Sequence, residues 1–184
     1  MIVEVDASTI GGLGPTGPQG NSITGPTGPT GPAPTGNYTL SENSSLILNA
    51  GLSATGKYTG ITISGTAGAT LSFGNLVMFD SSTSKWKLAD ISASAGTAGD
   101  ARGLLGICVL GATDTQTTTI FLLGTIRNTS FPSLTINGAV YASTSGAVVV
   151  TQPSTTDYVI RVLGFAITSD EMCFNPSPDY FTHI

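Results

Sequence analysis

The sequence predicts an all-β protein in two parts, an N-terminal collagen-like triple-helical stalk and a C-terminal β-sandwich or barrel, assembled as a homotrimer. Two observations carry this prediction. The 184 residues include 28 Thr, 20 Ser, 24 Gly and 10 Pro but only 9% charged residues. This composition suits strands and turns rather than helices, which need charged residues on their exposed faces. Short β-branched and aromatic runs also recur at about ten-residue intervals, as in sandwiches and barrels.

Composition also limits the classes of function. The net charge is −5, with 6 Lys and Arg residues against 11 Asp and Glu residues, and the basic residues form no cluster. Because phosphate neutralisation requires concentrated Lys and Arg, we expect no nucleic-acid partner. No apolar run reaches the roughly 18 residues of a membrane span, and the start of the chain carries no secretory signal. We therefore expect cytoplasmic synthesis and no membrane insertion.

Residues 1–10 form the first predicted part. Their apolar residues, Ile2, Val3, Val5 and Ile10, are separated by acidic residues in a nearly strand-like alternation. Such a short peptide at the end of a thin stalk has no core of its own to pack against. It is therefore either frayed or an anchor that adds to a sheet or groove of another protein, and the anchor is the interpretation that we favour.

Residues 11–36 form the predicted stalk, in which glycine recurs at every third position and proline often follows it. Gly-X-Y periodicity is the signature of the collagen triple helix, because only glycine fits at the crowded axis of three polyproline-II chains. A longer step between Gly20 and Gly25 interrupts the phase, and a flexible linker is the alternative. The glycines in phase are Gly11, Gly14, Gly17, Gly20, Gly25, Gly28 and Gly31.

So short a triple helix has marginal stability, so another part of the chain has to bring three copies together. The C-terminal domain is the candidate. The sequence therefore predicts a parallel homotrimer, with three β domains at one end and three N-termini at the other.

Residues 37–184 form the predicted β domain. The segments 80–85 and 143–146 are typical of hairpin turns, and the small residues of 91–102 predict a mobile loop. No window carries helical periodicity, so we expect almost no α-helix. The predicted strands are 46–48, 60–63, 75–79, 85–88, 104–110, 118–123, 138–141, 147–150, 159–167 and 180–184.

The sequence contains no recognisable catalytic constellation, so we expect no enzyme, no cofactor and no metal site. The single histidine, His183, is the penultimate residue, and no zinc-ligand spacing or phosphate loop is present. The acidic pair Asp170–Glu171 is typical of a solvated turn rather than an acid/base pair. Cys108 and Cys173 are interpreted as buried free thiols, with a disulfide as the alternative.

Three aromatic residues are candidates for a glycan site or a subunit interface. Trp86 alternates with Lys85 and Lys87, which places the lysines in solvent and the indole inward. A core or interface position is therefore favoured over a glycan platform. Tyr180 and Phe181 are neighbours on a predicted strand and point to opposite faces, so at least one of them is expected to be exposed or in an interface.

A last set of sequence blocks lies within 74–184 and consists of strand and turn patterns rather than catalytic signatures. The blocks are Gly74–Asp90, Gly103–Ile107, Leu122–Asn128, Arg161–Phe165 and Phe174–Ile184. Together they resemble the C-terminal β domain of tailed-bacteriophage fibre and head-fibre proteins. Gly-Pro-Thr repeats also occur in such fibres and in collagen-like spore-surface proteins. The resemblance implies a virion appendage with a trimeric stalk and a β tip, attached through a short N-terminal peptide.

The resemblance leads to a first functional hypothesis, a structural virion protein on the surface of a phage particle. It would be a trimeric head fibre or capsid decoration that adheres to the host or stabilises the particle. Its partners would be two further copies of itself and, through residues 1–10, a capsid or other virion protein. The alternative is a tail-borne receptor-binding fibre that recognises a host glycan. A depolymerase is the weakest hypothesis, because neither a nucleophile with a base nor paired carboxylates are apparent.

Overall fold

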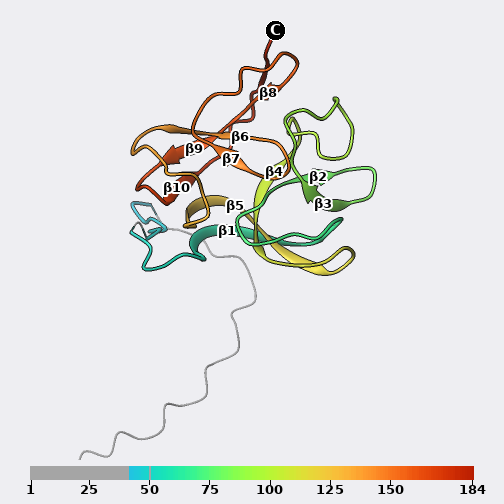
Figure 1. Cartoon of the computed structure of the whole chain (residues 1–184). Helices are drawn as coiled ribbons and strands as arrows, with labels where there is room; N and C mark the ends of the chain where they lie inside the picture. Colours follow the sequence, from blue (N-terminus) through green and yellow to red (C-terminus); the bar gives the residue numbers. More distant parts are fainter. Residues whose placement is uncertain (1–41, 50) are drawn as a thin grey trace, which may run out of the picture. The chain divides into compact units, whose positions relative to one another are not determined.

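The computed structural model describes residues 42–49 and 51–184 (Figure 1). The chain divides into two units, Met1–Ser44 and Ser45–Ile184, and every strand of the described residues belongs to the second. Three predictions fall outside the described residues: the anchor at 1–10, the stalk at 11–36 with its phased glycines, and the domain boundary at 37.

The described residues are all-β, as the composition predicts, and contain no helix that is long and apolar enough to cross a membrane. Nine strands form one antiparallel sheet, and two short strands pair separately. In chain order the strands are β1 (Lys57–Thr66), β2 (Leu76–Asp80), β3 (Lys85–Leu88), β4 (Leu105–Leu110), β5 (Thr117–Arg127), β6 (Ala139–Ala142), β7 (Val148–Val149), β8 (Val159–Ile160), β9 (Val162–Ala166), β10 (Glu171–Phe174) and β11 (Phe181–Thr182).

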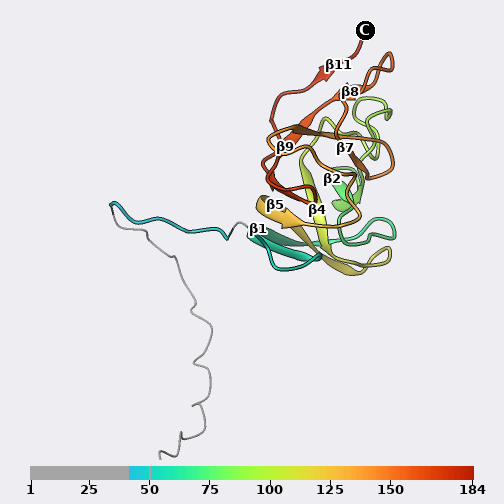
Figure 2. The same cartoon turned by 60° about the vertical axis from the view of Figure 1, so that its left-hand side comes forward.

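The longest strand, β5, joins the two halves of the sheet. On one edge it pairs with β1 along its whole length, from Arg127 opposite Lys57 to Thr117 opposite Thr66. On the other edge it pairs with β4 near its start and with β10 near its end. The strand order is therefore β3-β2-β4-β5-β10-β9-β6-β7, with β1 beside β5, and the sheet curves strongly around its core (Figure 1 and Figure 2).

A row of glycines crosses four strands of this sheet. Gly60, Gly124 and Gly164 lie in register across β1, β5 and β9, with Phe174 of β10 between the last two. The φ angles of Gly60 and Gly124 are +151° and +134°, in a region that residues with a Cβ rarely adopt. Glycine therefore allows a backbone conformation in these strands that other residues would rarely adopt. The Phe174 side chain in the same row is fully buried.

Two hydrophobic clusters lie on opposite faces of the central strands. The larger cluster draws on both halves of the sheet and includes Phe121 and Phe174, and the smaller one surrounds Trp86. β2 contributes to both, because Leu76 belongs to the larger cluster and its neighbour Val77 to the smaller. A strand that is buried on both faces appears in the sequence as an uninterrupted apolar run.

Most of the predicted strands are present, but two of them differ. The turns at 80–85 and 143–146 join β2 to β3 and β6 to β7, as predicted. The predicted strand 159–167 is interrupted at Arg161 and forms β8 and β9. The predicted strand 46–48 lies outside every sheet, with its side chains exposed. A strand requires a paired neighbour, and residue type alone does not specify one.

The predicted solvated turn at Asp170–Glu171 is wrong for Glu171, whereas Asp170 lies partly exposed in the bend between β9 and β10. Glu171 is 1% exposed and begins β10, a strand that was not predicted. Its carboxylate accepts hydrogen bonds from the backbone N–H groups of Gly51 (3.1 Å) and Leu52 (3.0 Å). Carboxylates are rarely buried unless they are paired, and only the folded chain supplies these two donors.

The same region fixes the point where the chain joins the β domain. Arg127 donates one hydrogen bond to the carbonyl of Leu52 (2.6 Å) and another to the carboxylate of Asp170 (2.9 Å). The Thr125 hydroxyl donates to the carbonyl of Asn49 (2.7 Å). We call residues 49, 51 and 52 the entry segment. Side chains of β5 and β10, together with Asp170, thus hold its backbone on the sheet.

Candidate functional site

The end of the β domain away from the entry segment carries three elements, which we call the distal end. They are the loop 91–102, the loop 150–158 and the paired strands β8 and β11. Both views place β8 across the domain from β1 (Figure 1 and Figure 2). Binding residues are commonly carried by loops on a rigid scaffold. The distal end is therefore the candidate site of this domain.

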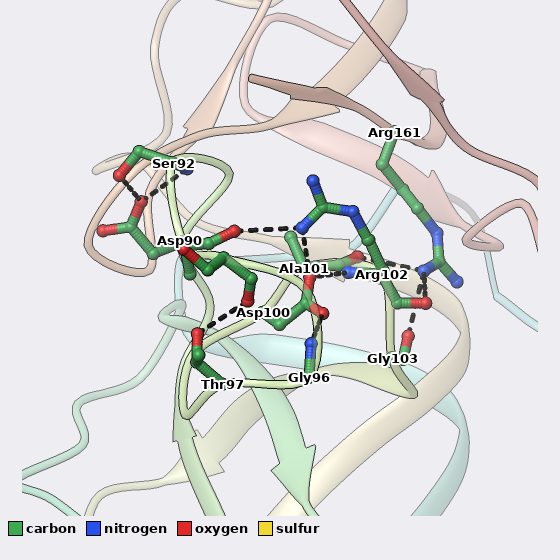
Figure 3. Close-up of polar contacts among 11 residues, drawn as sticks. Asp90, Ser92, Gly96, Thr97, Asp100, Ala101, Arg102, Gly103 and Arg161 are labelled. Carbon is green, nitrogen blue, oxygen red and sulfur yellow. Dashed lines mark hydrogen bonds and ion pairs between the residues drawn. The ribbon is translucent and has the colours of Figure 1, made fainter. Parts of the chain in front are cut away.

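Two aspartates fasten the loop 91–102 (Figure 3). The Asp90 carboxylate accepts hydrogen bonds from the backbone N–H (2.9 Å) and the hydroxyl (2.6 Å) of Ser92. The Asp100 carboxylate accepts from the backbone N–H groups of Gly96 (2.7 Å) and Arg102 (3.0 Å) and pairs with the Arg102 guanidinium (2.9 Å). The small residues of this loop predicted mobility, but Asp side chains that bond the neighbouring backbone give it a defined path.

Arg161 connects this loop to the C-terminal segment. Its buried guanidinium donates through Nη1 to the carbonyls of Ala101 (3.0 Å), Arg102 (2.7 Å) and Gly103 (2.9 Å), as Figure 3 shows. Its Nε donates to the carbonyl of Ser177 (2.7 Å). Burial lowers the pKa of the Arg161 guanidinium, but an arginine remains charged at neutral pH. The buried cation is therefore satisfied by main-chain carbonyls and acts as a structural brace.

The C-terminal segment that Arg161 holds continues to Tyr180 and Phe181, the two aromatic residues that the sequence predicts to be exposed or in an interface. Tyr180 and Phe181 are 43% and 71% exposed. The Arg102 guanidinium lies 5.8 Å from the centre of the Tyr180 ring, a cation–π distance. Both rings line a cavity of about 400 Å³ with Ser177 and Asp179. Both aromatic side chains are thus accessible at the distal end.

A second cavity at the distal end was not anticipated from the sequence. It has a volume of about 480 Å³, and Ile91, Val149 and Tyr158 contribute apolar surface to it. None of the lining residues is charged. The polar lining residues are Ser143, Thr144, Thr151, Gln152, Ser154 and Thr155. This lining offers hydrogen bonds to a neutral, hydroxylated ligand.

Trp86 lies in the core, one of the two positions that the sequence favours, whereas the prediction of a buried Cys173 is wrong. Trp86 is 2% exposed, lies in the smaller cluster and contacts Phe79 edge-on at 5.4 Å between ring centres. It therefore offers no surface to a glycan or a partner subunit. Cys108 is buried, as expected, but Cys173 is exposed and both thiols are free. The exposure of Cys173 follows from its place on the outward face of β10, which was not predicted.

Within the described part of the chain, no three His, Cys, Asp or Glu side chains gather where they would hold a metal ion. The distal end combines hydroxyl side chains, exposed aromatic rings, an arginine brace and the carboxylates of Asp100 and Asp179. A scan against protein-family models finds no match to this chain, and a search of curated proteins finds none either.

Proposed function

We propose that this protein is a structural virion protein, a homotrimeric fibre that a phage particle displays as a head fibre or capsid decoration. The observation that carries the proposal is the order of parts along the chain. An anchor-like peptide and collagen-phase triplets precede a β domain that holds its entry segment through Glu171 and Arg127. Tyr180 and Phe181 are accessible at the other end of that domain, where β11 lies (Figure 2).

In a trimer, three distal ends can bind the same surface together, which a single copy cannot do. Three copies on one stalk bind a surface with avidity, so contacts that are individually weak become effective. The Gly-X-Y stretch would provide a thin spacer of roughly 70 Å if it is triple-helical. The proposed task of the distal ends is therefore weak adhesion to the host surface.

Two measurements test this proposal. Sedimentation of the full chain should give about three times its mass of 18.6 kDa. Antibody raised against residues 45–184 should label the heads of purified virions in electron micrographs. A monomer in solution, or particles without label, would overturn the proposal, whereas label at the tail would favour the alternative.

The proposed anchor can be tested separately. Replacing Val3 and Val5 with Asp removes apolar side chains from the peptide, and the matched control replaces Glu4 with Gln. We expect the first variant to remain a trimer but to be missing from particles, because the docking peptide has lost its apolar contacts. The control should be incorporated normally. Normal incorporation of both variants would place the anchor elsewhere.

The distal cavity near Tyr158 favours the second candidate, a tail-borne receptor-binding fibre that recognises a host glycan. Its uncharged hydroxyl and amide side chains suit a neutral saccharide, and the Tyr158 ring suits the apolar face of a sugar. On a glycan array, the full-length trimer should bind neutral saccharides, and Tyr158→Ala should lose at least tenfold in affinity. Phe181→Ala is the control outside this cavity. If the wild-type trimer binds no glycan, this candidate fails.

A further inference from the structure

An apolar strip crosses the outward face of four neighbouring strands. Ile61 of β1 pairs with Leu123 of β5, and Cys173 of β10 pairs with Phe165 of β9. Thr125 connects the two pairs, because it lies opposite Cys173 and two positions from Leu123 on β5. Cross-strand partners, and residues two apart on one strand, share a face of the sheet. We call Ile61, Leu123, Cys173 and Phe165 the outer strip.

The outer strip is open to solvent in the single chain. Ile61, Leu123 and Phe165 are 51%, 38% and 54% exposed, and Cys173 is exposed as well. The alternate residue Met172 is fully buried in the larger cluster, so the outer strip faces away from that core. Thr125, between the two pairs, is 7% exposed and bonded to Asn49, so the two exposed apolar pairs flank the entry segment. Apolar side chains gathered in this way mark an interaction surface.

The outer strip also ends at an open sheet edge. Among the residues that the structure describes, the ten-residue strand β1 forms a ladder with β5 alone, and an isolated bridge from Ala67 to Trp86 lies just beyond its end. Soluble proteins usually shield so long an edge, because its free N–H and C=O groups pair with other chains. A neighbour seated on the outer strip would lie beside this edge and shield it.

The position of the entry segment identifies the neighbour as a second copy of this chain. Thr125, in the same row as Cys173 and Phe165, bonds to Asn49, so the chain joins the domain on this face. In a trimer, three chains would leave one stalk and reach their entry segments through residues 37–48, at most about 43 Å when extended. We expect each domain to turn the face that receives this tether, and with it the outer strip, toward the shared axis.

The chemistry of this face suits identical copies. None of the four residues of the outer strip is charged, so three of these strips can meet without like-charge repulsion. Leu46 and Ile47 lie directly before the entry segment and are 71% and 83% exposed. They add exposed apolar surface to each chain just before the segment that enters this face.

We propose that the three outer strips meet around the threefold axis of the homotrimer, together with Leu46 and Ile47 of each chain. This inference rests on the proposed trimer and names the surface that forms it. Phe165, Ile61 and Cys173 become buried on assembly, and the open edge of β1 becomes shielded by the adjoining subunit.

Cys173 is a native reporter of this interface. A small aromatic disulfide reagent should leave Cys108 unmodified in the folded protein, because its thiol is buried. In the full-length wild-type trimer, we expect Cys173 to react at least tenfold more slowly than in a dissociated variant. This measurement reports on the interface in the wild-type protein, because Cys173 is a native residue.

The dissociated variant is Phe165→Asp, with Ile61→Asp as a second one. Both side chains are more than half exposed, so each variant should fold as judged by circular dichroism. Sedimentation should show that each raises the trimer dissociation constant at least a hundredfold, because a charge would be buried without a partner. Phe181→Asp, at an exposed residue of β11, is the matched control and should remain a trimer.

The outcomes separate this inference from the proposed function. If the wild type is a trimer but Cys173 reacts as fast as a free thiol, the subunits associate elsewhere and the trimer itself stands. If Phe165→Asp and Ile61→Asp form trimers as tight as the wild type, the inference is equally overturned. If the wild type is a monomer, both the interface and the proposed trimeric fibre are wrong.

Discussion

Gly60 and Gly124 face each other across β1 and β5, and each occupies space that a side chain on the other would need. A Cβ on Gly60 would overlap the carbonyl oxygen of Leu123 and lie 2.9 Å from Cα of Gly124. A Cβ on Gly124 would overlap the carbonyl oxygen of Thr59 and lie 2.8 Å from Cα of Gly60. Because backbone atoms line this contact, no side-chain rotation relieves it.

We therefore expect Gly124→Ala to lower the free energy of unfolding by at least about 3 kcal/mol, from strained φ and backbone overlap together. The matched control is Gly96→Ala, where φ is +74° but nothing lies within 4 Å of the added Cβ. Gly96→Ala should lower the free energy of unfolding by only about 1 kcal/mol, which is the cost of a left-handed conformation for a residue with a Cβ. Urea denaturation measures both. Equal losses would show that the contact with β1 does not require glycine.

Replacing Glu171 with Gln should loosen the entry segment. Glutamine has one carbonyl oxygen where the carboxylate has two acceptors for Gly51 and Leu52, so a buried N–H loses its partner. We expect a loss of about 1–2 kcal/mol in stability, with faster hydrogen exchange at these two amides. The exposed Glu42→Gln is the control and should change neither quantity. Unchanged exchange at Gly51 and Leu52 in Glu171→Gln would contradict this assignment.

Arg161→Met should release the loop 91–102 from the C-terminal segment. Methionine fills similar space but leaves four main-chain carbonyls without their donor, at a cost of about 3 kcal/mol. Trypsin reports the release, because Arg102 lies in the braced loop and should be cut faster in the variant. Lys57→Met, at an exposed position, is the control. Cleavage after Arg102 at the wild-type rate would rule out the bracing role.

The Asp80–Lys87 ion pair should make the free energy of unfolding depend on pH. The Lys87 ammonium lies 2.7 Å from the Asp80 carboxylate, and this bond, with those from Ser82 and Thr83, holds the pKa of Asp80 well below its usual range. An unfolded Asp has a pKa of about 3.9. The carboxylate therefore contributes stability above that pH and loses the contribution as the pH falls toward the folded pKa.

The measurement compares wild type with Asp80→Asn by thermal denaturation across pH 7 to pH 3. The wild type should be more stable at neutral pH, and the difference should narrow below about pH 4. Asp157→Asn is the control, because Asp157 is exposed and Asn tolerates its φ of +67°. A difference that stays constant down to pH 3 would exclude this linkage.

Residue type and spacing alone determined the all-β class, most of the strands and the hairpins around 80–85 and 143–146. These features depend on β-branched and aromatic preference and on turn residues, which act between neighbours in the chain. They are properties that a single sequence carries locally.

Only the tertiary structure decided the strand β10, the division at Arg161 and the place of the outer strip. Glu171 is buried because Gly51, 120 residues away in the chain, brings an N–H to it. Arg161 lies between β8 and β9, and its buried guanidinium donates to carbonyls of a loop that is distant in the chain. Burial of a charged group depends on partners that are remote in sequence, and the exposure of Phe165 depends on which strands lie beside β9.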